Sequence, residues 1–246
     1  MAICSLVVVP DVHVPFHDRK AWTLALKIIE GVKPDYVASL GDLGDFYAVN
    51  AHGKKYGREQ RFATELAAVR NAGREIISAS GRARRIWLQG NHEESFERYV
   101  AKYGSQLEGV LPDGQDLLQI PKKDTWVPYR STIEIGKVTL AHDIGHSGKG
   151  AVLQNLAAAG KNIITGHTHR AGLAWGGTTG GDRHFSMSCG WLGDRSQITY
   201  LHSTQMRDWA LGVGLVQIDQ KTGFCWPQFV PFVDYTAIVL EKAYKS

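Results

Sequence analysis

The stretch ICSLVVVPDVH, residues 3–13, decides the fold. Its first part, Ile3–Val9, is a continuous apolar run rich in β-branched side chains, which is typical of a strand buried on both faces of a sheet. The run stops at Pro10-Asp11-Val12-His13, where polar side chains begin. The sequence therefore predicts a fully buried strand that is followed by a polar loop.

The order of strand, polar loop and helix repeats after this first strand. A helix is predicted over residues 19–30, with Asp18 as its cap and Gly31 just after its end. Further elements are predicted as a strand over 36–40, a helix over 59–78 and a strand over 85–89. This β–α–β–α–β order predicts parallel strands whose carboxyl ends gather at one edge of the sheet.

The second half of the chain has a different pattern. The elements expected there are a hairpin of 131–135 with 137–141, a helix over 148–159, a strand over 162–165, and strands 212–218 and 224–230 around the turn Gln220–Gly223. Residues 96–128 carry little periodic signal. We therefore predict a single domain over residues 1–246, with a peripheral insertion or cap at 96–128.

Composition limits the class of protein. The chain has 246 residues, 43% of them hydrophobic, and its 28 basic and 24 acidic residues give a net charge of +4, which is compatible with an anionic substrate. Three widely spaced cysteines argue against a disulfide framework and a thiolate zinc site. No apolar run approaches the roughly 18 residues of a membrane helix, and the N-terminus lacks a secretory pattern. We expect a cytoplasmic protein without a membrane partner.

Metal-binding residue types follow five predicted strands. They are Asp11 and His13, then Asp42, then Asn91 with His92, then His142, and finally His167 with His169. Loops beyond the carboxyl ends of strands in such sheets converge on one crevice, so these residues can meet. The mixed nitrogen and oxygen donors suit divalent ions, with Mn²⁺ favoured and Fe²⁺, Zn²⁺, Ni²⁺ or Mg²⁺ as alternatives. With four or five of the histidines binding, seven or eight ligands exceed the usual set for one catalytic ion, so we predict two ions that share a bridging carboxylate.

Each motif also has a purely structural interpretation. Asp-x-His and Gly-Asp are common in turns, and Gly90-Asn91-His92-Glu93 is compatible with a turn before a helix whose dipole favours the acidic residues. A structural origin for all the motifs would require these residue types to fall at every strand end by coincidence.

The ordered set D-x-H, G-D-x-x-D, G-N-H-E, H and G-H-x-H, which spans Asp11 to His169, resembles the calcineurin-like metallophosphoesterase superfamily. The resemblance implies an α/β fold, a four-layer αββα sandwich of two mixed sheets flanked by helices, with a dinuclear metal site at the sheet edge. It places Asp11, His13 and His169 on one ion, Asn91, His142 and His167 on the other, and Asp42 between them.

The resemblance also implies two catalytic residues and a reaction. His92 would donate a proton to the leaving oxygen or stabilise charge in the transition state, and Asp45 would orient His92. The reaction implied is hydrolysis of a phosphate ester by a hydroxide that two metal ions activate.

Two departures from the family pattern bear on these expectations. Asp45 is followed by Phe46-Tyr47, where the serine/threonine phosphatase branch has Arg-Gly, which argues against that activity. His146 lies four residues after His142 and is an alternative ligand.

Substrate choice must come from residues outside the ligand set. Candidates for phosphate contacts are Arg170, Lys54, Lys55 and Arg58, and candidates for base stacking or for core packing are Tyr47, Trp175 and Trp191. The basic cluster Arg82, Arg84 and Arg85 precedes a strand and is expected at the opposite edge. We predict a phosphodiesterase or nuclease acting on nucleotides or nucleic acid. The alternatives are a phosphomonoesterase of small or protein phosphates and a metal-binding scaffold without turnover.

Overall fold

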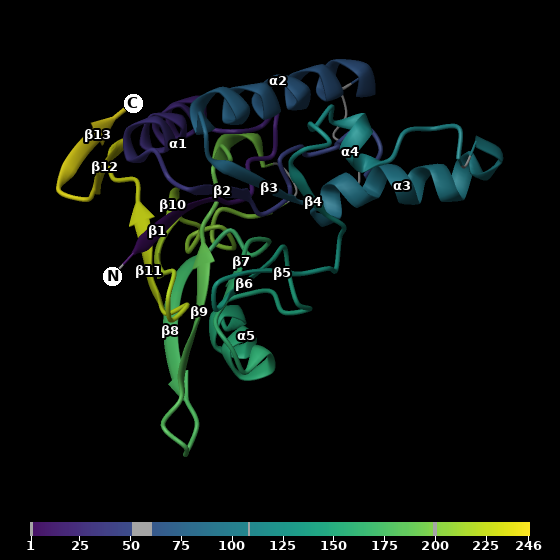
Figure 1. Ribbon diagram of the computed structural model, residues 1–246. Helices are drawn as coiled ribbons and strands as arrows, with labels where there is room; N and C mark the ends of the chain where they lie inside the picture. Colours follow the sequence, from purple (N-terminus) through teal and green to yellow (C-terminus); the bar gives the residue numbers. More distant parts are fainter. Residues whose placement is uncertain (1, 51–60, 108, 199–200) are drawn as a thin grey trace.

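In the computed structural model, which describes residues 2–50, 61–107, 109–198 and 201–246, the strands form two large mixed sheets and a separate hairpin (Figure 1). The first sheet has the order β11 (Cys225–Pro231), β10 (Gly212–Asp219), β1 (Ile3–Val9), β2 (Tyr36–Ser39), β3 (Arg84–Leu88) and β4 (Thr125–Val127). The second has the order β5 (Ile133–Ile135), β6 (Val138–Ala141), β7 (Ile163–Thr165), β9 (Arg183–Cys189) and β8 (Ala171–Gly177). The hairpin pairs β12 (Thr236–Val239) with β13 (Lys242–Lys245).

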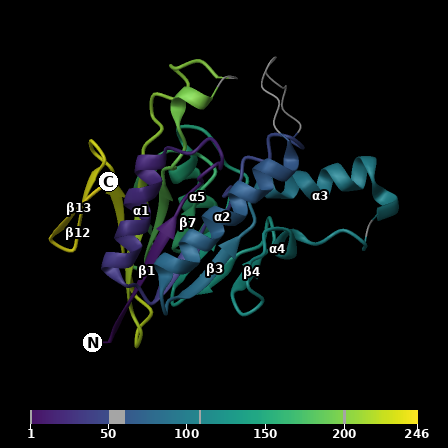
Figure 2. The same ribbon diagram turned by 90° about the horizontal axis from the view of Figure 1, so that it is seen from above.

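Helices cover the outer faces of both sheets. The helices are α1 (Arg19–Val32), α2 (Phe62–Ser80), α3 (Asn91–Tyr103), α4 (Gly114–Leu117) and α5 (Ala151–Ala159), with short 3-10 turns at Ser105–Leu107 and Arg195–Gln197. Figure 2 shows α1 and α2 side by side over the first sheet, and α5 packs on the second. The expected four-layer αββα sandwich is therefore confirmed.

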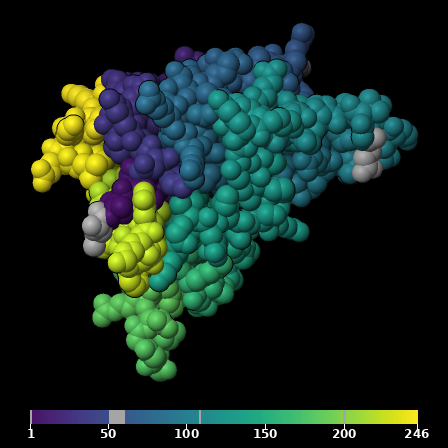
Figure 3. Space-filling view, viewed as in Figure 1, coloured from purple at the N-terminus to yellow at the C-terminus, as the bar shows by residue number. Residues whose placement is uncertain are grey.

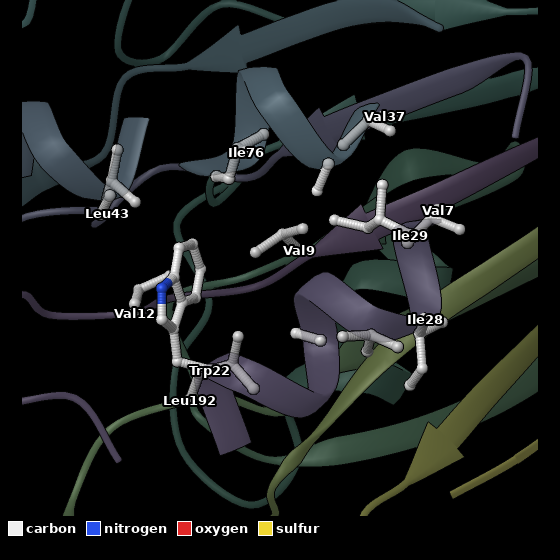
Figure 4. Close-up of a cluster of buried hydrophobic side chains, with 14 of the residues drawn as sticks. Val7, Val9, Val12, Trp22, Ile28, Ile29, Val37, Leu43, Ile76 and Leu192 are labelled. Atoms are coloured by element: carbon white, nitrogen blue, oxygen red, sulfur yellow. The ribbon is translucent and has the colours of Figure 1, made fainter. Parts of the chain in front are cut away.

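Strand β1 explains why two cores form. Leu6 and Val8 point into the apolar layer between the sheets, whereas Val7 and Val9 pack beneath the helices. Figure 4 shows this second layer, with Trp22, Ile28 and Ile29 of α1 and Ile76 of α2 around Val7 and Val9. Because both faces are buried, the strand tolerates no polar face, which confirms the interpretation of its continuous apolar run.

The parallel pairing positions the loops. Strands β1, β2, β3 and β4 run parallel in the first sheet, and β6, β7 and β9 run parallel in the second. Their carboxyl ends point to one common edge, where the chain bears its metal-binding motifs. In the described part of the chain, no helix is long and apolar enough to cross a membrane.

One predicted helix boundary was wrong, and one segment with little periodic signal contains regular structure. Helix α1 does not stop before Gly31 but continues to Val32, and Lys33 caps it with a left-handed backbone (φ 52°); Gly31 lies inside the helix, where the Tyr244 ring packs against it. Residues 96–128 are not irregular throughout: α3 continues to Tyr103 and projects from the body (Figure 3), and β4 pairs with β3 as an edge strand of the first sheet. The single domain and the peripheral insertion or cap at 96–128 stay predictions.

Candidate metal centre

The first group of candidate ligands joins the loop after β1 to the loop after β7. His13 Nε2 lies 2.9 Å from His169 Nε2, and His169 Nε2 lies 3.2 Å from Asp11 Oδ2. All three side chains are buried, with Asp11 fully inaccessible. These atoms lie close enough together to hold one metal ion.

The second group joins the loops after β3, β6 and β7. Asn91 Oδ1 lies 2.9 Å from both His142 Nε2 and His167 Nδ1. Asp42 Oδ2 lies 3.4 Å from His142 Nε2 and 4.0 Å from His13 Nε2 of the first group. The structure therefore places Asp42 between the two groups, which is where a bridging carboxylate would lie.

Backbone N–H groups orient the carboxylates of Asp42 and Asp11. The N–H of His92 donates to Asp42 Oδ1 (3.0 Å), and the N–H of His167 donates to Asp11 Oδ1 (3.0 Å). In each carboxylate one oxygen is thus held by a loop from another strand, and the other oxygen, Oδ2, faces the imidazoles. Asp11 Oδ2 is buried and accepts no hydrogen bond from the described residues. A buried carboxylate oxygen of this kind is costly unless a cation balances it, so the site suits divalent metal ions.

Asp42 and His169 have the charge states that a metal ion binds, whereas His13 must release a proton on binding, because the nearby carboxylates raise its pKa. Burial raises the pKa of Asp42, but the imidazoles of His142, His92 and His13 outweigh this effect and hold it well below its usual range. Burial lowers the pKa of His169 to about 4, although Asp11 opposes the shift. Asp42 is therefore ionised and His169 neutral near neutral pH, and these are the forms that bind a metal ion.

Glycines before the ligands have a steric explanation. A side chain at Gly90 would collide with the carboxylate of Asp42, and one at Gly166 would collide with that of Asp11. Four ligand residues, His13, Asp42, His167 and His169, have left-handed backbones with φ of 58°, 50°, 66° and 58°. Such conformations cost about 1–3 kcal/mol each and concentrate at functional sites.

Asp45 differs from the expected arrangement. Its backbone carbonyl, rather than its carboxylate, contacts His92, with 2.6 Å between Asp45 O and His92 Nδ1. The carboxylate lies 3.3 Å from His13 Nδ1 and 3.9 Å from His92 Nδ1. Burial lowers the pKa of His13, but Asp45 and Asp42 more than offset this and raise it to about 9. The main-chain position of Asp45 thus orients His92, and its side chain chiefly serves the ligand His13.

Glu93 is a positioning residue that the sequence pattern did not reveal. Its buried carboxylate accepts hydrogen bonds from the N–H groups of Asp42 (2.8 Å), Gly44 (3.0 Å) and Gly90 (2.8 Å). These bonds fasten the loop after β2 to the loop after β3. The acidic residue after Asn-His was interpreted only as favouring the helix start, because a single sequence does not show which distant N–H groups it meets.

We expect Glu93→Gln to lower the free energy of unfolding by about 2 kcal/mol or more, because the new amide nitrogen would face an N–H donor. Glu94→Gln is the matched control, since Glu94 makes a partly exposed i,i+4 ion pair with Arg98 (3.1 Å), which is worth only about 0.3–0.5 kcal/mol. Urea denaturation of both metal-free variants checks the difference. Equal losses would contradict a positioning role for Glu93.

The other predicted contacts fall in different places. Arg170 lines the pocket over the metal centre, and His146 lies in a neighbouring cleft rather than in the ligand cluster. Trp191 is fully buried and stacks on the ring of His169 at 5.0 Å, so it packs a ligand and does not offer a face for a base. Tyr47 is buried against Phe16, whereas Trp175 is exposed on β8.

The other basic residues singled out from the sequence lie either away from the pocket or outside the described residues. Arg85 forms a buried ion pair with Asp124 (2.8 Å), and Arg82 and Arg84 are exposed at the opposite edge, as expected. Lys54, Lys55 and Arg58 lie outside the described residues.

Comparison with known proteins gives distant similarity. No family model matches the sequence. The chain is 26% identical over 245 residues to the Gene 54 protein of Mycobacterium phage D29 and 25% identical over 255 residues to that of Mycobacterium phage L5, in each case covering 93% of both chains.

Solved structures that resemble it include Vps29 from Entamoeba histolytica (14% identity, 97% of this chain and 95% of that one, TM-score 0.44). Another is Yfce, a phosphoesterase from E. coli (15% identity, 91% of this chain and 98% of that one, TM-score 0.43). The sheet order and the layers of this chain define its fold. That fold and the order of the candidate metal-binding residues agree with the resemblance to the calcineurin-like metallophosphoesterases.

Proposed function

We propose that this protein is a metal-dependent phosphoesterase that hydrolyses phosphodiesters of nucleotides or nucleic acid. The observation that carries the proposal is the position of Asp42 between two groups of ligands, with His92 beside them in the pocket. Asp11, His13 and His169 would hold one ion, Asn91, His142 and His167 the other, and Asp42 both. Bound divalent ions would supply positive charge for the phosphate oxygens and lower the pKa of a water.

His92 supplies a proton in this proposal. The Asp45 carbonyl accepts a hydrogen bond from His92 Nδ1–H, which fixes the ring in the pocket next to Asp42 and Asn91. Only the protonated imidazole then carries a hydrogen on Nε2 as well, so the charged ring is the form that can protonate the leaving oxygen.

The diester preference rests on features around the ligands. The basic balance of the chain favours polyanionic substrates, and the Phe46-Tyr47 pair replaces the Arg-Gly of the protein phosphatase branch. Arg170 lies at the pocket wall, next to His169, where it is available to a second phosphate or to a phosphate oxygen.

We expect Mn²⁺-dependent hydrolysis of bis-p-nitrophenyl phosphate with a kcat/KM at least tenfold above that for p-nitrophenyl phosphate, and loss of both activities in excess chelator. Initial rates with Mn²⁺, Ni²⁺, Zn²⁺ and Mg²⁺ measure this. A preference for the monoester would overturn the diester assignment. Turnover of neither ester with any of these metals would overturn the phosphoesterase and favour a scaffold.

A further inference from the structure

A cleft of about 590 Å³ lies beside the metal centre. It is formed by the loop that joins β4 to β5 and the loop that follows β6, and its lining includes Tyr129, Arg130, Thr132, Asp143 and His146. Its volume is within the range of about 300–1,000 Å³ that small-molecule sites occupy. We call it the Tyr129 cleft.

The Tyr129 cleft is continuous with the pocket over the metal ligands. His167 and Ser147 line both the cleft and that pocket, which also contains Asp42, Asn91, His92 and His169. The ring of Tyr129 lies 6.0 Å from the ring of His142, a ligand of the second group. The Tyr129 cleft and Arg170 therefore both border the pocket over the metal ligands.

The side chains of the cleft match a nucleoside better than a bare phosphate. Tyr129 is half-buried, and the Arg130 guanidinium lies over its ring at 5.4 Å, so an aromatic ring and a planar cation adjoin. Bases stack on such groups with little dependence on sequence. Thr132 and Ser147 offer hydroxyl groups. Asp143 has one oxygen, Oδ1, that accepts the Gly145 N–H (2.9 Å), and its carboxylate, which also faces the Tyr129 hydroxyl, can accept a hydrogen bond from an amino or sugar hydroxyl group.

Arg130 is the cation that remains for a neighbouring phosphate. It is exposed, and its guanidinium lies over the ring of Tyr129 and also interacts with the Tyr129 hydroxyl. From the proposed function together with this geometry, we infer that the Tyr129 cleft binds one nucleoside of a single-stranded diester, with Tyr129 stacking on its base and Arg130 contacting the adjoining phosphate.

The test compares a nucleotide diester with one that has no nucleoside. Arg130→Gln should lower kcat/KM at least tenfold on a short single-stranded oligodeoxynucleotide but less than twofold on bis-p-nitrophenyl phosphate, and Tyr129→Leu should show the same selectivity. Arg84→Gln is the matched control, because Arg84 lies over the Tyr36 ring (5.7 Å) at the opposite edge of the sheet. Equal losses on both substrates, or no loss on either, would overturn the inference.

A binding measurement separates this inference from the proposed function. With metal-free protein and a fluorescent oligodeoxynucleotide, Arg130→Gln should weaken binding at least fivefold and reduce the slope of log K against log salt by about 0.7, the value for one lost contact to single-stranded phosphate. Failure of the wild type to hydrolyse any ester rejects the phosphoesterase alone. If Arg130→Gln binds the oligonucleotide as tightly as the wild type, the inference that the Tyr129 cleft binds a nucleoside is rejected and the proposed phosphoesterase function is not.

Discussion

Asp42→Asn is expected to remove nearly all activity, with kcat/KM reduced about 10³-fold or more. The Oδ2 atom of Asp42 faces candidate ligands of both groups, at 3.4 Å from His142 Nε2 and 4.0 Å from His13 Nε2. Replacing the carboxylate with a neutral amide therefore removes a negative charge that lies next to both ion positions. A loss of about 4 kcal/mol of transition-state stabilisation corresponds to this factor, since each 1.36 kcal/mol is tenfold. The amide oxygen can still accept the His92 N–H, so the loops should keep their places.

Metal content distinguishes this effect from misfolding. We expect elemental analysis of the Mn²⁺-loaded wild type to give two ions per chain and that of Asp42→Asn to give one or fewer, with unchanged circular dichroism. The control is Asp219→Asn, because Asp219 is also buried but accepts hydrogen bonds from Lys221 N–H (3.0 Å) and the Thr222 hydroxyl (2.8 Å) at the opposite end of β1. Full metal content and full activity in Asp42→Asn would refute the bridging role.

The sequence predicted the elements that local patterns determine. The apolar run Ile3–Val9 is unbroken because the strand is covered on both faces, and each metal-binding motif follows a strand because strand ends are where a buried sheet meets solvent. The structure brings both ligand groups together at the sheet edge that this reasoning indicated.

Long-range contacts determined what the sequence did not predict. Helix α1 continues past Gly31, where the Tyr244 ring packs, and β4 is ordered as a strand by pairing with β3. The carboxylate of Asp45 lies nearer to His13 than to His92, and the N–H of Asp45 donates to Val14 O (2.9 Å), a long-range hydrogen bond that holds Asp45 beside the loop of His13. None of these partners is adjacent in the chain, so no periodicity or motif spacing records them.

His92→Gln is expected to lower kcat by about 10²–10⁴-fold, the usual contribution of a general acid, while both ions stay bound. The ring is positioned by the Asp45 carbonyl, 2.6 Å from its Nδ1, and glutamine supplies no acidic proton in its place. The loss should grow as the leaving group becomes more basic, because a poor leaving oxygen depends more on protonation.

The dependence is measured by comparing the loss of kcat in His92→Gln on a dinucleotide with the loss on bis-p-nitrophenyl phosphate. Elemental analysis of the same protein measures its metal content. The control is His184→Gln, on β9 and outside the pocket that contains His92, which should retain full turnover and full metal content. An equal loss on both esters would assign His92 to charge stabilisation rather than to proton donation. Loss of a metal ion in His92→Gln would instead make it a ligand, because it lies in one of the close groups with His13 and Asp42.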